Sequence, residues 1–260
     1  MTTELTNPVS YYLQLGEDKI CLNDWLDKPI SIHFERQIEC VACGRKTNKS
    51  FNQGFCYPCF KSLPQCDICI VSPEKCHHHH GTCRDNEWAE KNCFAPHIIY
   101  FSNTSGIKVG ITRQAQVPTR WIDQGARQAT PVLQVSNRFY SGLIETAFKQ
   151  YMNDKTNWRT MLKDEFNSAD LEALFAKLWP KVKAELDPEV ANDAQVLISA
   201  DSTVDIYYPS IEYPTKITSF NLDKTPTVSG VLKAIKGQYL ILDTGVINIR
   251  KFSGYKVTIE

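Results

Sequence analysis

The cysteines are the residues of this chain whose type and spacing point most directly to chemistry. The chain has ten of them, and nine fall between Cys40 and Cys93. The stretch opens with two C-x2-C pairs, separated by twelve residues: Cys40 with Cys43, and Cys56 with Cys59. Each such turn aims two thiolates at one ion, and Gly44 permits the backbone conformation that brings amide groups near the sulfurs. We predict a structural zinc site formed by these four cysteines. Four unligated cysteines or an iron–sulfur cluster are the alternatives, and the two-knuckle spacing favours zinc.

A second group of metal-ligand residues follows directly. Cys66 and Cys69 form a third C-x2-C pair, and the remaining residues of the group are Cys76, His77 to His80, Cys83, Cys93 and His97. We predict a second structural zinc ion, and the favoured ligands are Cys66, Cys69, Cys76 and Cys83. His77, Cys93 or His97 are rivals for one of these positions. Closed four-ligand shells leave no open place for water, so both sites serve to fold a segment that lacks a core of its own.

The change of composition along the chain predicts an α+β protein of several small units. Residues 1–37 read as strands, which are candidates to join a C-terminal β-domain. Residues 38–95 form the cysteine-rich, zinc-ribbon-like region. Residues 96–190 alternate strands and helices, which indicates a small mixed sheet, and residues 196–260 read as a small β-domain with Gly and Pro turns.

The middle unit carries the clearest element pattern. Strands are predicted at 97–101 and 107–111, joined by a turn, and near 132–135. A short helix should hold Arg120 and Trp121. A longer helix is expected to begin at an N-cap Ser141 and to run to Asp154. A further helix over 169–179 is expected to be interrupted by Pro180.

Residues 97–158 also carry a set of motifs. Tyr100 lies in an Ile-Ile-Tyr-Phe run, Lys108 begins Lys-Val-Gly-Ile-Thr, Arg120 falls ten residues after Gly110, and Glu145 precedes Trp158. This set resembles the GIY-YIG nuclease superfamily, especially a divergent branch whose second motif reads Lys-Ile-Gly-x-Thr. The first motif departs from Gly-Ile-Tyr, and Lys108 stands where the second motif usually has a tyrosine.

A broader resemblance covers most of the chain. It is carried by the segments 40–59, 81–84, 108–113, 120–126 and 236–239. These resemble a bacterial family of unknown function in which a zinc-binding N-terminal region precedes a GIY-YIG-like domain.

The nuclease resemblance implies roles for four residues. Glu145 would hold one divalent cation, magnesium or manganese, against the scissile phosphate, and Arg120 would neutralise the charge growing on that phosphate. Tyr100 would help to activate or position the nucleophile. Lys108 could donate to a phosphate oxygen, and it could act as a base only if its pKa were strongly lowered.

Two functions follow, and both stay open at this stage. One is a metal-dependent endonuclease acting on DNA or RNA. The other is a non-catalytic nucleic-acid-binding or protein-interaction adaptor that retains the nuclease fold. Further nucleic-acid contacts are expected from Arg113, Lys236, Arg250 and Lys251, the last three near aromatic residues. The balance of 29 basic and 29 acidic residues argues against a strong long-range attraction for nucleic acid.

The N-terminus has neither a basic start nor an apolar stretch, and no segment of the sequence approaches about 20 apolar residues. We therefore expect no membrane span and a cytoplasmic location, where thiols bind metals more often than they form disulfides.

Overall fold

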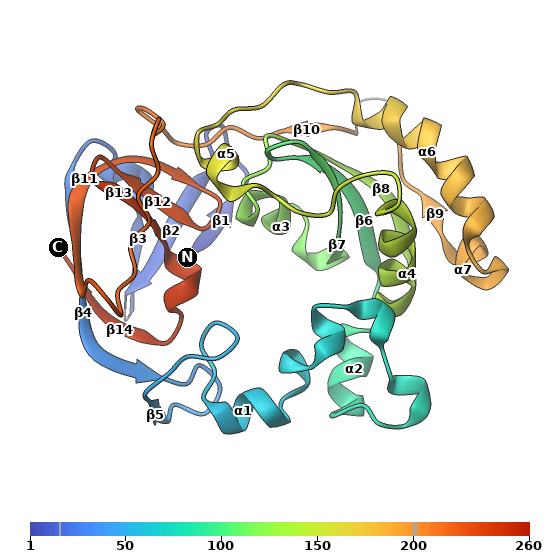
Figure 1. Cartoon of the computed structure of the whole chain (residues 1–260), viewed down its shortest axis with the longest axis horizontal. Helices are drawn as coiled ribbons and strands as arrows, with labels where there is room; N and C mark the ends of the chain where they lie inside the picture. Colours follow the sequence, from blue (N-terminus) through green and yellow to red (C-terminus); the bar gives the residue numbers. More distant parts are fainter. Residues whose placement is uncertain (16, 200–201) are drawn as a thin grey trace.

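The computed structural model of the chain describes residues 1–15, 17–199 and 202–260, and it confirms a mixed α+β protein (Figure 1). The described strands form three antiparallel sheets. The first sheet consists of β1 (Thr2–Glu4), β2 (Ser10–Leu15) and β3 (Asp18–Cys21). The second contains β4 (Pro29–Glu39), β5 (Lys46–Thr47), β11 (Thr227–Lys236), β12 (Tyr239–Leu242), β13 (Gly245–Asn248) and β14 (Tyr255–Ile259). The third contains β6 (His97–Asn103), β7 (Ile107–Arg113), β8 (Gln128–Val135), β9 (Gln195–Val196) and β10 (Val204–Asp205).

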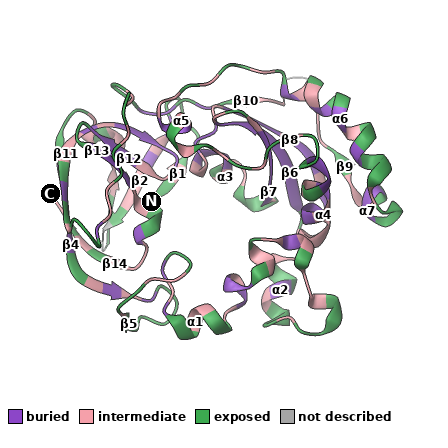
Figure 2. Ribbon diagram, viewed as in Figure 1, coloured by how far each residue is buried: buried purple, intermediate pink, exposed green. Residues whose placement is uncertain are grey.

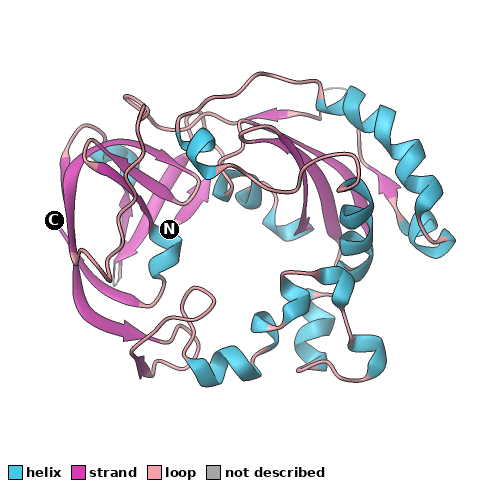
Figure 3. Cartoon of the chain, viewed as in Figure 1, coloured by secondary structure: helices cyan, strands magenta, loops and turns pink. Residues whose placement is uncertain are grey.

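The helices cluster in the cysteine-rich region and around the third sheet (Figure 3). The α-helices are α1 (Tyr57–Ser62), α2 (Asn86–Asn92), α3 (Thr119–Asp123), α4 (Arg138–Phe148), α5 (Trp158–Leu162), α6 (Leu171–Glu185) and α7 (Pro188–Asp193). Short 3-10 turns are η1 (Leu22–Trp25), η2 (Pro64–Cys66), η3 (Ile68–Ile70), η4 (Pro73–Lys75), η5 (His78–His80), η6 (Gln114–Gln116) and η7 (Ile249–Phe252). None of the helices in the described ranges has the length and hydrophobicity needed to cross a bilayer.

The long strand β4, from the N-terminal part of the chain, pairs with two strands from the C-terminal part. It pairs on one side with β11, where Ile32 lies opposite Val228, and on the other with β14, where Ile32 lies opposite Ile259. The second sheet therefore has the order β13-β12-β11-β4-β14 (Figure 1). Because the far end of β4 runs directly into Cys40, this sheet fixes the start of the first cysteine cluster.

Strand β6 is the centre of the third sheet, and every one of its residues is buried (Figure 2). Alternate side chains of a strand point to opposite faces, so β6 contributes to two cores. Ile98 and Tyr100 belong to a core shared with the first two sheets, whereas Ile99 and Phe101 pack in a core with α4 and α6. Burial on both faces explains the continuous apolar run that this strand shows in the sequence.

The helices α4 and α6 differ from the prediction at their ends. Asn137 caps α4 by accepting a hydrogen bond from the Tyr140 backbone N–H at 2.9 Å, so the expected cap, Ser141, lies inside the helix and donates to the Arg138 carbonyl at 2.7 Å. The helix ends at Phe148 rather than at Asp154. The prediction that Pro180 interrupts α6 was wrong. The helix continues through the proline to Glu185, because the buried residues Leu178 and Val182 anchor it on both sides.

The cysteine-rich region packs against the start of α4. A Cβ atom added at Gly142 would lie 2.7 Å from the backbone nitrogen of Glu74, so only glycine admits the η4 backbone here. Arg138, in the first turn of α4, donates to the Ile70 carbonyl at 2.6 Å. The part of the cysteine-rich region around η3 and η4 is therefore fixed to the helix that carries Glu145.

Candidate metal centre and the cluster around Lys108

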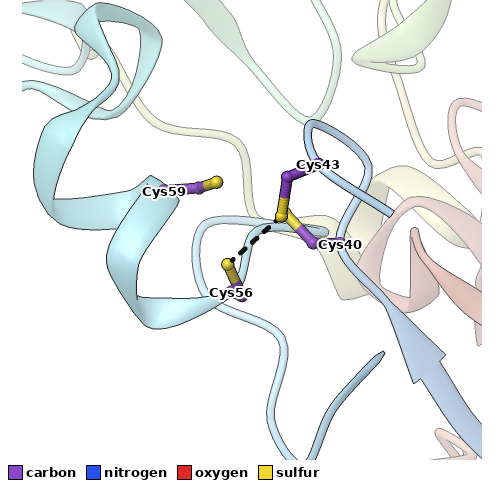
Figure 4. A group of neighbouring side chains, drawn as sticks. All are labelled: Cys40, Cys43, Cys56 and Cys59. Atoms are coloured by element: carbon purple, nitrogen blue, oxygen red, sulfur yellow. Dashed lines mark hydrogen bonds between the residues drawn. The ribbon is translucent and has the colours of Figure 1, made fainter. Parts of the chain in front are cut away.

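Cys40, Cys43, Cys56 and Cys59 form one cluster, in which all four sulfur atoms lie within 4.8 Å of one another (Figure 4). The Sγ atoms of Cys43 and Cys56 are 3.8 Å apart. A tetrahedral zinc ion with bonds of about 2.3 Å to each sulfur requires sulfur–sulfur distances of about 3.8 Å. All four are free thiols rather than disulfides. The cluster could therefore hold a metal ion, and its donor set and spacing are compatible with zinc.

The local backbone prepares these thiols for a metal. Gly44, at φ +69°, closes a turn in which its N–H donates to the Cys40 carbonyl at 2.8 Å. Burial alone would raise the pKa of Cys40, but backbone N–H groups of Cys56, Cys43 and Ala42 point at its sulfur and lower the pKa to about 6. A hydrogen bond with Cys56 raises the pKa of Cys59 to about 12, so a metal ion that binds this sulfur must displace its proton into the solvent.

The second predicted ligand set is only partly assembled. Cys69, Cys76 and Cys83 line one small cavity of about 20 Å³, but Cys66 does not line it and is buried in η2. Cys93, one of the rival ligands, lines this cavity. No three of the four lining sulfurs lie within 4.8 Å of one another in the described structure.

The two histidines that are alternative ligands, His77 and His97, differ in their neighbouring groups. His77 lies with Asp67 and Cys69 within 4.8 Å, but its Nε2 is 3.4 Å from Asp67, whose carboxylate also meets the Arg84 Nε at 2.6 Å. A guanidinium in contact with this carboxylate repels a cation there. The His97 Nδ1 lies 2.7 Å from the Ala95 carbonyl, and His97 does not line the cavity.

The four motif residues of the 97–158 segment come from four elements: Tyr100 from β6, Lys108 from β7, Arg120 from α3 and Glu145 from α4. They lie near enough to affect one another electrostatically. The charges of Arg120 and Glu145 both act on Tyr100, and both act on Lys108. The fold therefore brings together residues that are up to 45 positions apart, from Tyr100 to Glu145.

Tyr100 is sealed inside this cluster. Its side chain has 0% exposure, and its ring lies over Gly110, where an added Cβ would be 2.6 Å from the tyrosine Cζ. The hydroxyl donates to the Gln124 Oε1 at 3.1 Å. Burial raises the pKa of Tyr100 to about 12, although the Arg120 charge and a hydrogen bond with Arg120 act in the opposite direction. In this structure Tyr100 supports Arg120 and Gln124 and has no access to a ligand.

Lys108 is 5% exposed, and the pKa of its ammonium group is shifted from the ordinary value. Burial, followed by repulsion from Arg120, lowers its pKa to about 8, while Glu145 and Asp154 act to raise it. Among the described residues no carboxylate oxygen lies within the 4.0 Å ion-pair distance of Lys108 or Arg120. The buried Lys108 therefore feels the charge of Arg120, and neither cation has a direct anionic partner among the described residues.

Glu145 is paired with a cation from its own helix. The Lys149 Nζ lies 3.2 Å from a Glu145 carboxylate oxygen and 3.4 Å from Asp154. Burial raises the pKa of Glu145, and the charge of Lys149 opposes that shift. The lysine ammonium between two carboxylates shows that this place attracts positive charge. Sequence reasoning missed Lys149 and Asp154; the i, i+4 spacing of Glu145 and Lys149 was the available signal.

The four residues expected to contact nucleic acid differ in their burial and in their partners. Arg113 donates to the Asn92 side chain at 2.6 Å, Arg250 pairs with Asp123 at 3.4 Å, and Lys251 is exposed beside the Phe252 ring. Lys236 is 0% exposed and forms an ion pair with Asp164. Its ammonium cannot reach the phosphate of a bound nucleic acid, which corrects the expectation for this residue.

A larger hollow, of about 690 Å³, lies on the β-domain and is separate from the Lys108 cluster. Arg250 and Lys256 line it, with apolar residues of β2, β4 and β14. Neither Lys108 nor Glu145 reaches it, so the hollow and the motif residues are distinct features of the molecule.

Comparison with known proteins identifies a family match. A family model described as "Protein of unknown function (DUF2797)" matches residues 27–257. The search of curated proteins and the search of solved structures found no significant match.

Proposed function

The chain belongs to this DUF2797 family, and from its own site residues we propose that it is a zinc-binding protein that binds nucleic acid, with Lys108 and Arg120 as the phosphate contact. One observation carries the proposal. The charge of Arg120 acts on the buried Lys108, and no described carboxylate is within ion-pair distance of either. Holding like charges together away from water is costly unless an anion offsets it. A phosphate group, which accepts hydrogen bonds from both lysine and arginine, fits that requirement.

The surroundings support a polyanion rather than a single small anion. Arg113 and Arg138 lie close enough that Arg113 and Arg120 both lower the pKa of Arg138, after the effect of burial. The chain as a whole is neutral, so this concentration of cations is a local feature. A local group of cations of this kind favours the phosphates of a nucleic-acid backbone. The four-cysteine cluster contributes by holding the cysteine-rich region in its folded position.

Replacement of Lys108 tests the proposal. Lys108→Gln should weaken binding of short fluorescein-labelled RNA and DNA strands by about tenfold, because one charge-assisted contact contributes about 1.5 kcal/mol. The pKa of about 8 adds a second signature. Lys108 is charged below that pH and loses its proton as the pH rises through it, so wild-type affinity should fall above pH 8.

Lys108→Arg is the matched control. It keeps the charge at every pH of the experiment, so the decline of affinity above pH 8 should disappear. Fluorescence anisotropy at low and high salt measures all three proteins. No binding by the wild type even at low salt, or equal affinity of the Gln variant and the wild type, would contradict the proposal.

A second candidate function is metal-dependent cleavage of the bound strand, and the position of Glu145 favours it. Its carboxylate and that of Asp154 share the Lys149 ammonium, which marks a place suited to a cation. When a magnesium or manganese ion binds there, it supplies electrostatic stabilisation of a leaving oxygen. Glu145 would hold that ion, and Arg120 and Lys108 would orient the phosphate beside it.

This candidate predicts cleavage that depends on magnesium or manganese and falls at least a hundredfold in Glu145→Gln, since metal-held electrostatic stabilisation contributes at least that factor. Thr146→Ala, at the exposed neighbouring position on α4, is the control and should cleave like the wild type. Gel analysis of labelled RNA and DNA measures the rate. Retained binding without any cleavage in either metal would identify a binding protein and exclude the enzyme.

A further inference from the structure

We propose a second zinc site whose ligands are Cys69, Cys76, Cys83 and Cys93. The main observation is a small cavity that these four cysteines line together. It lies where the loops around η3 to η5 meet α2. Its volume is about 20 Å³, which leaves room for an ion and excludes a larger ligand. The ligand set differs from the C-x2-C expectation, because Cys93 takes the place of Cys66.

The charge of the neighbouring helix gives an independent reason. Arg138 donates to the Ile70 carbonyl at 2.6 Å and approaches the Cys69 carbonyl at 3.5 Å, so its guanidinium lies against this cysteine loop. Among the described residues it has no ion pair with a carboxylate. A zinc ion with four thiolates carries a net charge of about −2, which would offset this partly buried cation.

The spacing of the four cysteines along the chain also fits a single metal site. Six, six and nine residues separate the four cysteines in sequence. Cys69 lies in η3, Cys76 directly follows η4 and Cys93 directly follows α2. The segment that contains them has only short 3-10 turns and the seven-residue helix α2. A metal that joins four such points would replace the hydrophobic core that the segment lacks.

Binding requires local movement of the thiols. No three of these sulfurs are yet within 4.8 Å of one another, and the Cys83 thiol donates to the Asp85 carbonyl at 3.5 Å. Each cysteine must turn its sulfur toward the cavity, release its proton to water and donate one electron pair to the ion. All four cysteines are free thiols, so no disulfide has to be reduced first.

The rival site is Asp67 with Cys69 and His77, whose ligand atoms already lie within 4.8 Å of one another. Arg84 argues against it. Its Nε contacts Asp67 at 2.6 Å, and its Nη1 donates to the carbonyls of Phe60 and Leu63. Asp67 and Arg84 thus form a fixed link between α1 and the following loop, and the carboxylate is already occupied by a cation.

Zinc counting in variants of the full chain tests the assignment. The wild type should contain about two zinc ions per chain, and Cys93→Ser and Cys83→Ser should each contain about one. Cys66→Ser is the matched control and should keep about two. Loss of one zinc in Cys66→Ser but not in Cys93→Ser would overturn the ligand set, and so would loss in Asp67→Asn or His77→Ala.

A second measurement separates this site from the first. In Cys56→Ser, which disables the first cluster, the remaining metal site can be filled with cobalt(II). The visible absorption of this preparation should be that of a tetrahedral site with four thiolates, and it should change when Cys83→Ser is added. A wild-type protein with only one zinc ion, lost in Cys56→Ser, would show that the second site does not exist.

Discussion

The variant Cys56→Ser should lose the first zinc ion and unfold the segment around residues 40–62. Cys56 is buried, its sulfur lies 3.8 Å from that of Cys43, and it forms the N-terminal cap of α1. Structural zinc sites contribute roughly 10–16 kcal/mol of apparent binding free energy, far more than this short segment can obtain from its own packing. Hydrogen–deuterium exchange should therefore show loss of protection over these residues, and the zinc count should fall.

Cys21→Ser is the control for this experiment. Cys21 ends β3, apart from both cysteine groups, so the same chemical change there should leave the zinc content and the exchange pattern unaltered. Removal of zinc from the wild type with a strong chelator should reproduce the Cys56→Ser pattern. Full protection of residues 40–62 in a metal-free preparation would show that the segment folds without the ion.

Asp164→Asn should be the most destabilising of the conservative substitutions outside the cysteine clusters. Asp164 pairs with both Arg127 and Lys236, and Lys236 is 0% exposed. Loss of the carboxylate leaves two cations without their anion, and breaking such buried pairs costs about 3–5 kcal/mol. Lys236→Met should cost less, because Asp164 retains Arg127 and the methionine keeps most of the buried volume.

Urea unfolding monitored by circular dichroism measures these changes. The exposed pair of Lys163 and Glu165, whose ion-pair distance is 3.9 Å, supplies the controls Lys163→Met and Glu165→Gln. Both should change the unfolding free energy by less than about 1 kcal/mol. Equal midpoints for Asp164→Asn and Glu165→Gln would mean that the buried pairs contribute little.

The first metal site could be predicted from the sequence because its geometry is local. Each C-x2-C turn fixes two sulfurs by itself, and only the meeting of two turns depends on the fold. The second set of cysteines is different. Whether Cys66 or Cys93 lines the cavity depends on how α2 packs against the preceding loops, and spacing along the chain does not contain that information.

The strands of the central unit could also be predicted, whereas several polar residues could not be placed. The hairpin of β6 and β7 has the turn and the apolar runs expected of it. The predicted start of α4 was wrong because Asn137 and Ser141 are both good N-cap residues. In the fold Asn137 is the cap. Lys236 looked like a surface cation because its burial comes from partners distant in sequence, above all Asp164.

The two-sided burial of β6 has an evolutionary consequence. Tyr100 packs in the same core as Tyr11, Ile206 and Leu240, which lie outside residues 97–158 on either side. In a fragment of residues 97–158 alone, the face of β6 that carries Ile98 and Tyr100 would lose these partners and expose apolar surface to water. The segment is therefore a poor candidate for shuffling as an independent module, and substitutions on that face are constrained by all three sheets together.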